Sequence, residues 1–284
     1  MGSSLLITLR EGLEIALVLA VVVAYLNRIG RSDRIGAVWA GAAAAAAVCV
    51  VAGLAFNGFV GEFEGKWEQF IEGVLAMAAA LVLTWMIFWM RGHAKGIATE
   101  LHARIDRAVE ESPGAVAMVA FVAVAREGFE TVLFLLGAET ASASGAQVVI
   151  GGLIGLAVAA VIGGLVFVGG GRVDVKKFFN WTGLLLILFA AGLAAKAVHE
   201  FRELFELEGA WYSVPVWEIT SGPLASGWVH DMLKGLFGWS ADPERIRVAT
   251  YLAFVIPALW LYYREPKAPA PVRAAEGARP AVEV

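Results

Sequence analysis

The 284-residue chain is 59% hydrophobic and only 17% charged, and its mean hydropathy is +0.72. Soluble domains carry charge on about a quarter of their residues, and a net charge of −4 provides no basic surface for nucleic acid. The single cysteine, Cys49, excludes an intrachain disulfide and a thiolate metal site. These values exclude a soluble enzyme and a nucleic-acid-binding protein, and they predict an all-α integral membrane protein surrounded by lipid.

Seven apolar segments are predicted to form transmembrane helices. Six are long enough to cross a hydrocarbon core of about 30 Å at about 1.5 Å per residue. The seventh is shorter, contains Pro257 and ends in aromatic residues typical of a membrane interface. The predicted spans are residues 4–26, 35–56, 68–90, 114–137, 146–168, 178–199 and 248–263.

Lysine and arginine gather after the first, third, fifth and seventh predicted spans, whereas the alternate loops hold few. Basic loops remain in the cytoplasm, so we expect the N-terminus outside and the C-terminus in the cytoplasm. Residues 1–263 are then a single transmembrane domain, residues 264–284 a disordered cytoplasmic tail, and the amphipathic segment 224–239 a helix on the outer leaflet. The basic residues are Arg28, Arg31 and Arg34; Arg91, Lys95, Arg104 and Arg107; Arg172, Lys176 and Lys177; and Arg264, Lys267, Arg273 and Arg279.

A charged five-residue motif occurs twice inside the predicted spans. Residues 10–14 are Arg-Glu-Gly-Leu-Glu, and residues 126–130 are Arg-Glu-Gly-Phe-Glu. Three spans separate the two copies, and an odd number inverts the second copy in the membrane. The chain is therefore predicted to contain two inverted three-helix repeats, at about 4–90 and 114–199, plus a seventh span at about 248–263. Transporters built in this way bind their substrate near the bilayer midplane, between the repeats.

The acidic residues of the two motifs are candidate metal ligands. Four carboxylates and two guanidiniums leave a formal charge of −2, which in a low dielectric requires protonation or a bound cation. Carboxylate oxygens favour hard cations, of which Fe³⁺ is the hardest common one, although Fe²⁺, Mn²⁺ and protons fit the same residues. The candidate ligands are Glu11, Glu14, Glu127 and Glu130.

The motif arginines are expected to orient these carboxylates rather than to touch the ion. The alternative is that Arg10–Glu14 and Arg126–Glu130 are packing pairs that only hold helices together. That alternative leaves one excess carboxylate in each copy, which is costly in a membrane. The duplicated excess therefore favours a functional site.

Further charged residues lie near the outer ends of the third and sixth spans. Glu72 is interpreted as part of a cation entrance, against the alternative that it complements the helix dipole. Lys196 is a candidate counter-ion for Glu72 or a motif carboxylate, unless it snorkels to the interface. Glu200, Glu203 and Glu206 recur every three residues, which suits cation collection but is also common on solvated helix faces.

The paired motifs resemble the oxidase-dependent iron transporter family, whose hallmark is an R-E-G-[LF]-E element in the first and fourth spans. The resemblance covers most of residues 1–263. It also includes Glu72-Gly73, Thr84-Trp85-Met86 and Trp89-Met90, and then Gly192-Leu193-Ala194-Ala195-Lys196 and His199-Glu200-Phe201.

The resemblance implies a permease, not an enzyme, that imports ferric iron across a bacterial inner or cell membrane, with the motif carboxylates carrying the ion. It implies no resident cofactor, external E-x-x-E elements that gather iron, and two external partners. These are an iron-oxidising peroxidase or oxidase and a periplasmic or surface iron-binding protein. A proton-coupled carrier of Fe²⁺, Mn²⁺ or Pb²⁺ is the alternative. Gly151 and Gly155 form a small-residue pair that suits helix packing within one subunit or in a homo-oligomer.

An intramembrane enzyme is the third hypothesis, and a zinc protease of this kind is excluded by one residue. Such an enzyme needs an H-E-x-x-H element, and in this chain Glu203 stands where the second histidine would be after His199-Glu200. A passive scaffold, the fourth hypothesis, does not explain the duplicated charges.

Overall fold

The computed structural model describes residues 2–60, 65–93, 97–140, 145–169, 175–207 and 211–264, and the predicted tail lies outside them from residue 265. These residues form helices and no extended strand. The α-helices are α1 (Gly2–Arg28), α2 (Ile35–Val60), α3 (Lys66–His93), α4 (Ile97–Glu111), α5 (Pro113–Thr140), α6 (Gly145–Gly169), α7 (Val175–Leu204), α8 (Trp228–Phe237) and α9 (Arg245–Tyr263), with short 3-10 turns at Ser32–Arg34 and Trp211–Ser213.

A helix covers each of the seven predicted spans. Within the described residues, five helical segments are apolar and long enough to cross a membrane. Both α1 and α5 fall outside that set because each carries the three charged residues of a motif. The apolar segments are Ser32–Phe56, Lys66–Trp89, Gly145–Leu165, Lys177–Leu204 and Arg245–Tyr263.

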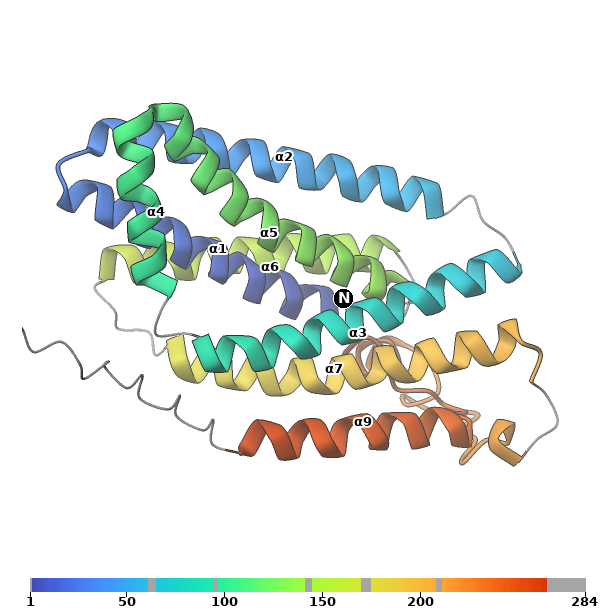
Figure 1. The fold of residues 1–284 in the computed structure, drawn as a ribbon. Coiled ribbons are helices and arrows are strands. Elements are labelled where there is room, and N and C mark those ends of the chain that lie inside the picture. The colour runs from blue at the N-terminus through green and yellow to red at the C-terminus, as the bar shows by residue number, and fades with distance from the viewer. Residues whose placement is uncertain are drawn as a thin grey trace, which may run out of the picture.

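The long helices lie side by side in one bundle (Figure 1). The most extensive packing joins α1 to α6, α2 to α5 and α3 to α7, with α9 against the free side of α7. Helices α1 and α5 also pack against each other and run in opposite directions. The buried apolar residues form two clusters, one between α3, α5, α7 and α9 and one between α1, α2, α4 and α5. The motif helices α1 and α5 therefore lie at the centre of the bundle.

Helix α4 was not predicted, because the segment between the third and fourth spans was interpreted as a basic loop. The helix lies across one end of the bundle (Figure 1). Its apolar face buries Ile105, Ala108 and Val109, while its polar face carries an ion pair of 2.6 Å between Arg104 and Glu100. These apolar residues recur at helical spacing, so periodicity predicts this element once the charges are treated as one face of a helix.

Helix α8 lies deeper than an interfacial helix would. It packs against α7 and the first turn of α1, and it ends at Gly238, whose φ of 67° lies in the left-handed region. A Cβ on Gly192 would lie only 2.7 Å from the Gly238 nitrogen. Gly192 precedes the last residue of α7 by 12 positions, or about 18 Å of helix. Helix α8 therefore folds back against α7 and α1.

Candidate metal site

Three motif carboxylates meet where α1 and α5 cross. Glu11, Glu14 and Glu127 each offer one oxygen, and these oxygens all lie within 4.8 Å of one another. Glu11 and Glu14 reach the same place because a spacing of three residues puts them on one side of α1. The antiparallel packing of α1 and α5 brings Glu127 to the same depth. The cluster is the right size for one cation bound between two helices.

The motif arginines lie against the carboxylates, as the spacing of the motif predicts. The Nε atom of Arg10 is 3.1 Å from Glu14, and its Nη1 atom is 4.0 Å from Glu11. The Nε atom of Arg126 is 3.2 Å from Glu130 and 3.6 Å from Glu127. Each guanidinium therefore spans both carboxylates of its own motif.

Glu130 does not belong to the three-carboxylate cluster. Its interaction is with Arg126, which donates a hydrogen bond from Nε to Oε1 at 3.2 Å. The other Glu130 oxygen is buried and has no hydrogen-bond partner among the described residues. Glu130 thus lies beside the cluster with one oxygen unused.

Buried oxygens without a hydrogen bond are the strongest local indication of a ligand. Both oxygens of Glu11 and one oxygen of Glu127 have no hydrogen-bond partner within the described part of the chain. The Glu11 side chain is only 1% exposed. Such groups are costly to bury, and a coordinated cation would satisfy them.

The motif glycines show that the two copies pack alike. A Cβ on Gly12 would lie 2.7 Å from the Cβ of Ala159 in α6, and a Cβ on Gly128 would lie 2.5 Å from the Sγ of Cys49 in α2. The glycine between the two motif glutamates therefore allows a close helix contact in both copies. Gly12 lets α1 approach α6, and Gly128 lets α5 approach α2.

The same correspondence continues one turn further along these helices. A Cβ on Gly163 of α6 would lie 2.5 Å from the Cβ of Ala16, and a Cβ on Gly53 of α2 would lie 3.4 Å from Val132. Ala16 and Val132 each follow their motif glycine by four residues, as Gly163 and Gly53 follow Ala159 and Cys49. The α1–α6 and α5–α2 contacts therefore share one register.

A second charged cluster lies between α3 and α7. The Nζ atom of Lys196 is 2.7 Å from Glu72 and 3.6 Å from Glu200. Of the partners considered for Lys196 from the sequence, the structure selects Glu72. A single lysine held between two carboxylates offsets part of their negative charge.

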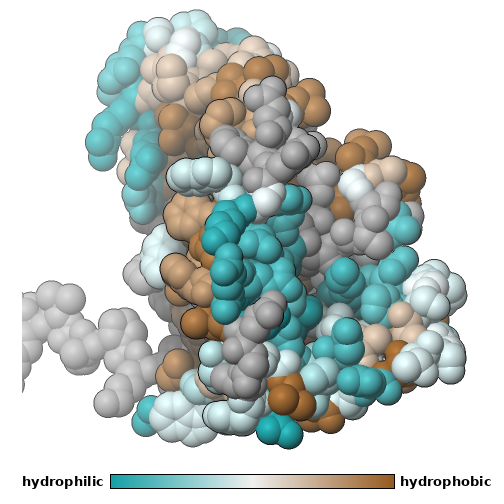
Figure 2. Space-filling view, turned by 90° about the vertical axis from the view of Figure 1, so that its right-hand side faces the viewer, coloured by the Kyte–Doolittle hydropathy of each residue, from teal (hydrophilic) through white to brown (hydrophobic). Residues whose placement is uncertain are grey.

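The remaining acidic residues lie nearer the end of α7. Glu203 is 3.4 Å from His199 and 3.6 Å from Arg202, while Glu206 pairs with Lys66 of α3 at 2.6 Å. Figure 2 shows hydrophilic residues gathered on this face of the molecule, where α3 begins and α7 ends. Of the predicted collection residues, Glu203 and Glu206 are therefore exposed, whereas Glu200 is largely buried.

Sequence reasoning missed Glu244, the residue before α9. Its carboxylate lies 2.7 Å from Arg202 and 3.2 Å from His199. The pairing joins residues more than 40 positions apart across the segment that folds back, and no local pattern indicates it. The prediction placed a helix at 224–239 in this segment but gave Glu244 no role.

A bundle of long apolar helices with paired arginines and carboxylates in its interior is typical of a membrane transporter for cations. The chain belongs to the iron permease FTR1 family, whose profile matches residues 1–262. This confirms the family that the two motifs indicated.

Curated relatives resemble the chain over nearly its whole length. It is 37% identical over 270 residues to the ferrous iron permease EfeU of Yersinia pestis, which covers 93% of this chain and 94% of the relative. It is also 37% identical over 268 residues to the ferrous iron permease EfeU of Escherichia coli O6:K15:H31, with 93% of this chain and 95% of the relative covered. No solved structure matches the chain.

Proposed function

We propose that the protein is a plasma-membrane permease that imports iron through the carboxylates of its two motifs. The observation that carries this proposal is the convergence of Glu11, Glu14 and Glu127 within 4.8 Å inside the bundle. Membership of the family supports iron as the substrate. The cluster supports a position inside the bundle where an iron ion could bind.

The proposal includes seven spans with the N-terminus outside. Helices α1 and α5 lie among the apolar helices, and the charges of each motif are paired within their own helix. The ends of α1, α3, α6 and α9 lie at the same end of the bundle as the beginnings of α2, α5 and α7 (Figure 1). The connections at this end are the basic ones, which supports placing it in the cytoplasm.

The proposal also includes two inverted repeats. Exchanging the halves converts the α1–α6 contact into the α5–α2 contact and leaves the α3–α7 contact in place. The matched glycine contacts described above support the same exchange at residue level. The cluster then lies on the axis that relates the halves, where such transporters hold their substrate.

The form of iron proposed is Fe³⁺. The cluster as described contains carboxylates only, and hard oxygen ligands favour a hard, highly charged cation. The curated relatives are named for ferrous iron, so Fe²⁺ is the second candidate. External oxidation of iron by a peroxidase or oxidase, and delivery by an iron-binding protein, belong to the Fe³⁺ proposal.

The proposed path begins at the hydrophilic face. Iron is first attracted by Glu203 and Glu206, then competes with Lys196 for Glu200 and Glu72, and next reaches the carboxylates between α1 and α5. Release follows when the two halves rearrange and open the cluster to the cytoplasm. Arg10 and Arg126 hold the carboxylates in place throughout.

The test is uptake of radioactive iron into proteoliposomes, supplied either as ferric citrate or as Fe²⁺ with ascorbate. We expect Glu14→Gln and Glu130→Gln each to abolish uptake. The first removes a ligand of the cluster, and the second removes the neighbouring charge, which holds Arg126 through one oxygen and leaves the other oxygen for the ion. The matched control is Glu100→Gln, which removes an exposed glutamate from an equivalent i,i+4 arginine pair on α4 and should transport normally.

Size-exclusion chromatography in detergent verifies that each variant is folded. Normal transport by both motif variants would reject the site. Uptake of Fe²⁺ but not Fe³⁺ by the unmodified protein would reject the ferric form and leave the site intact.

A further inference from the structure

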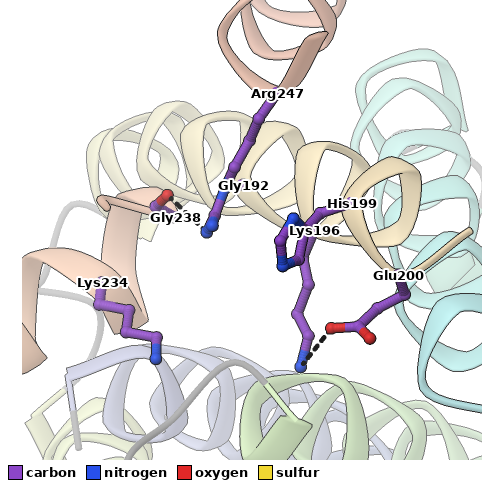
Figure 3. A pocket seen from close by; sticks show the side chains of 7 residues that line it. All are labelled: Gly192, Lys196, His199, Glu200, Lys234, Gly238 and Arg247. Carbon is purple, nitrogen blue, oxygen red and sulfur yellow. Dashed lines mark hydrogen bonds and ion pairs between the residues drawn. The ribbon is translucent and has the colours of Figure 1, made fainter. Parts of the chain in front are cut away.

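A separate cavity of about 140 Å³ lies between α7, α8 and α9 (Figure 3). It contains none of the motif carboxylates. The residues that line it are Gly192, Lys196, His199, Glu200, Lys234, Gly238 and Arg247. Because α8 folds back against α7, side chains from three helices face this one space.

The lining is rich in positive charge. Lys196, Lys234 and Arg247 each bring a cation, and Glu200 is the only carboxylate among the lining residues. Figure 3 shows the three cationic side chains extending toward the same space from different helices. Positive groups from three helices are more than this one carboxylate can neutralise.

Two of these cations are compensated only from a distance, Lys234 by Asp231 and Glu200, and Arg247 by Glu244, Asp242 and Glu200. Lys234 forms no ion pair within 4.0 Å in the described part of the chain, and burial together with the nearby Lys196 and Arg247 lowers the pKa of its ammonium group. Arg247 donates one hydrogen bond, from Nη2 to the carbonyl of Gly238 at 3.3 Å. Its Nε atom is buried and has no hydrogen-bond partner among the described residues.

The carboxylates around the cavity are already engaged elsewhere. Glu72 binds Lys196 from the α3 side at 2.7 Å. Glu244 lies 2.7 Å from Arg202, and Asp231 lies 3.4 Å from His230. These groups moderate the local field from outside, but none of the three lines the cavity.

We propose that this cavity binds a small oxyanion, such as phosphate or a small carboxylate, through Lys234, Arg247 and Lys196. Ammonium and guanidinium groups are the donors that form the strongest hydrogen bonds to such anions. The volume suits a small anion and excludes a bulky one.

Lys196 couples this site to the acidic residues beside it. A bound anion competes with Glu72 and Glu200 for the Lys196 ammonium group. It therefore weakens the ion pairs that Lys196 forms with these two carboxylates. This coupling rests on the proposed function, but binding of the anion itself does not. The experiment therefore measures binding without iron.

The test is isothermal titration of inorganic phosphate into the purified full chain, free of iron, in detergent. We expect saturable binding, and we expect Lys234→Gln to weaken it at least about tenfold, the loss typical of one charged hydrogen bond. Lys234→Arg should retain most of the affinity because it keeps the charge. The matched control is Lys66→Gln, which removes an exposed lysine from the same face and should bind as the unmodified protein does.

A comparison of lipids separates the two sources of the anion. Binding of phosphate in nanodiscs of phosphatidylcholine and of phosphatidylglycerol identifies a free anion as the occupant. Binding blocked only by phosphatidylglycerol, in a way that depends on Lys234, identifies a lipid headgroup in the same site. Absence of phosphate binding to the unmodified protein in phosphatidylcholine, or equal binding by Lys234→Gln, would overturn the proposal.

Discussion

The two copies of the charged motif are almost identical in sequence but differ in surroundings. The Arg10 side chain is only 3% exposed, whereas the Arg126 side chain is 46% exposed. Helix α1 is enclosed by α5, α6 and the folded-back α8, while Arg126 lies over the ring of Trp89 at 5.1 Å. The second glutamate of each motif is equally exposed at 13%. The comparison shows that nearly identical motifs can place their arginine in an enclosed position in one copy and an exposed position in the other.

The largest expected effect comes from removing the two arginines in turn. Arg10→Gln should lower the free energy of unfolding by about 3 kcal/mol or more, because it leaves buried carboxylates without their counter-charge. Arg126→Gln should cost less than Arg10→Gln, because the Arg126 side chain is 46% exposed and is less enclosed by neighbouring helices. Unfolding in mixed micelles measures both. Equal losses would mean that the difference in burial has no energetic consequence.

The glycine contacts test whether the α1–α6 and α5–α2 contacts correspond, and the expected loss of stability is smaller. Gly12→Ala and Gly128→Ala should each cost about 1–3 kcal/mol, the typical penalty for overpacking a close contact. Ala159→Gly should restore stability to the first variant and Cys49→Gly to the second, because each removes the atoms that the new methyl group meets.

The crossed combinations are the controls for that experiment. Gly12→Ala with Cys49→Gly, and Gly128→Ala with Ala159→Gly, should show no rescue. Rescue by either partner would mean that the helices relax as a whole, and the two contacts would then not be a matched pair.

The smallest effect is expected at the exposed pair of Lys66 and Glu206. The hydrogen bond and the charge of Lys66 hold the pKa of the Glu206 carboxyl below its ordinary value. A lowered carboxyl pKa stabilises the folded state above the ordinary value, and this contribution disappears as the pH falls through the folded pKa. A carboxyl NMR titration should show this low pKa and its rise in Lys66→Gln. An unchanged pKa in that variant would show that the pair is not formed in solution.

Much of the bundle could be predicted because its information is local. Hydrophobic segment length located all seven long helices, and the motif spacing located the residues that meet between α1 and α5. Helix α7 continues to Leu204, five residues beyond the predicted span. The helical spacing of the acidic residues after His199 is consistent with this, but the pairing of His199 and Arg202 with Glu244 was not predicted.

The parts that could not be predicted depend on distant contacts. The depth of α8 follows from a close approach of Gly192 and Gly238, and neither glycine identifies the other in the sequence. The cavity at Lys234 and Arg247 exists only because of that approach. Helix α4 is different, because its amphipathic spacing was present and was overlooked in favour of its charge.

The division of the carboxylate cluster between α1 and α5 has a consequence for the order of synthesis. Glu127 follows Glu14 by 113 residues, so at about 5–20 residues per second the first half waits about 6–23 s for the second. During that interval Arg10 and Glu14 can neutralise each other within α1, but the third carboxylate of the cluster has not yet been made. The cluster can therefore assemble only after α5 has been synthesised, and the first half alone cannot offer a cation the same three oxygens.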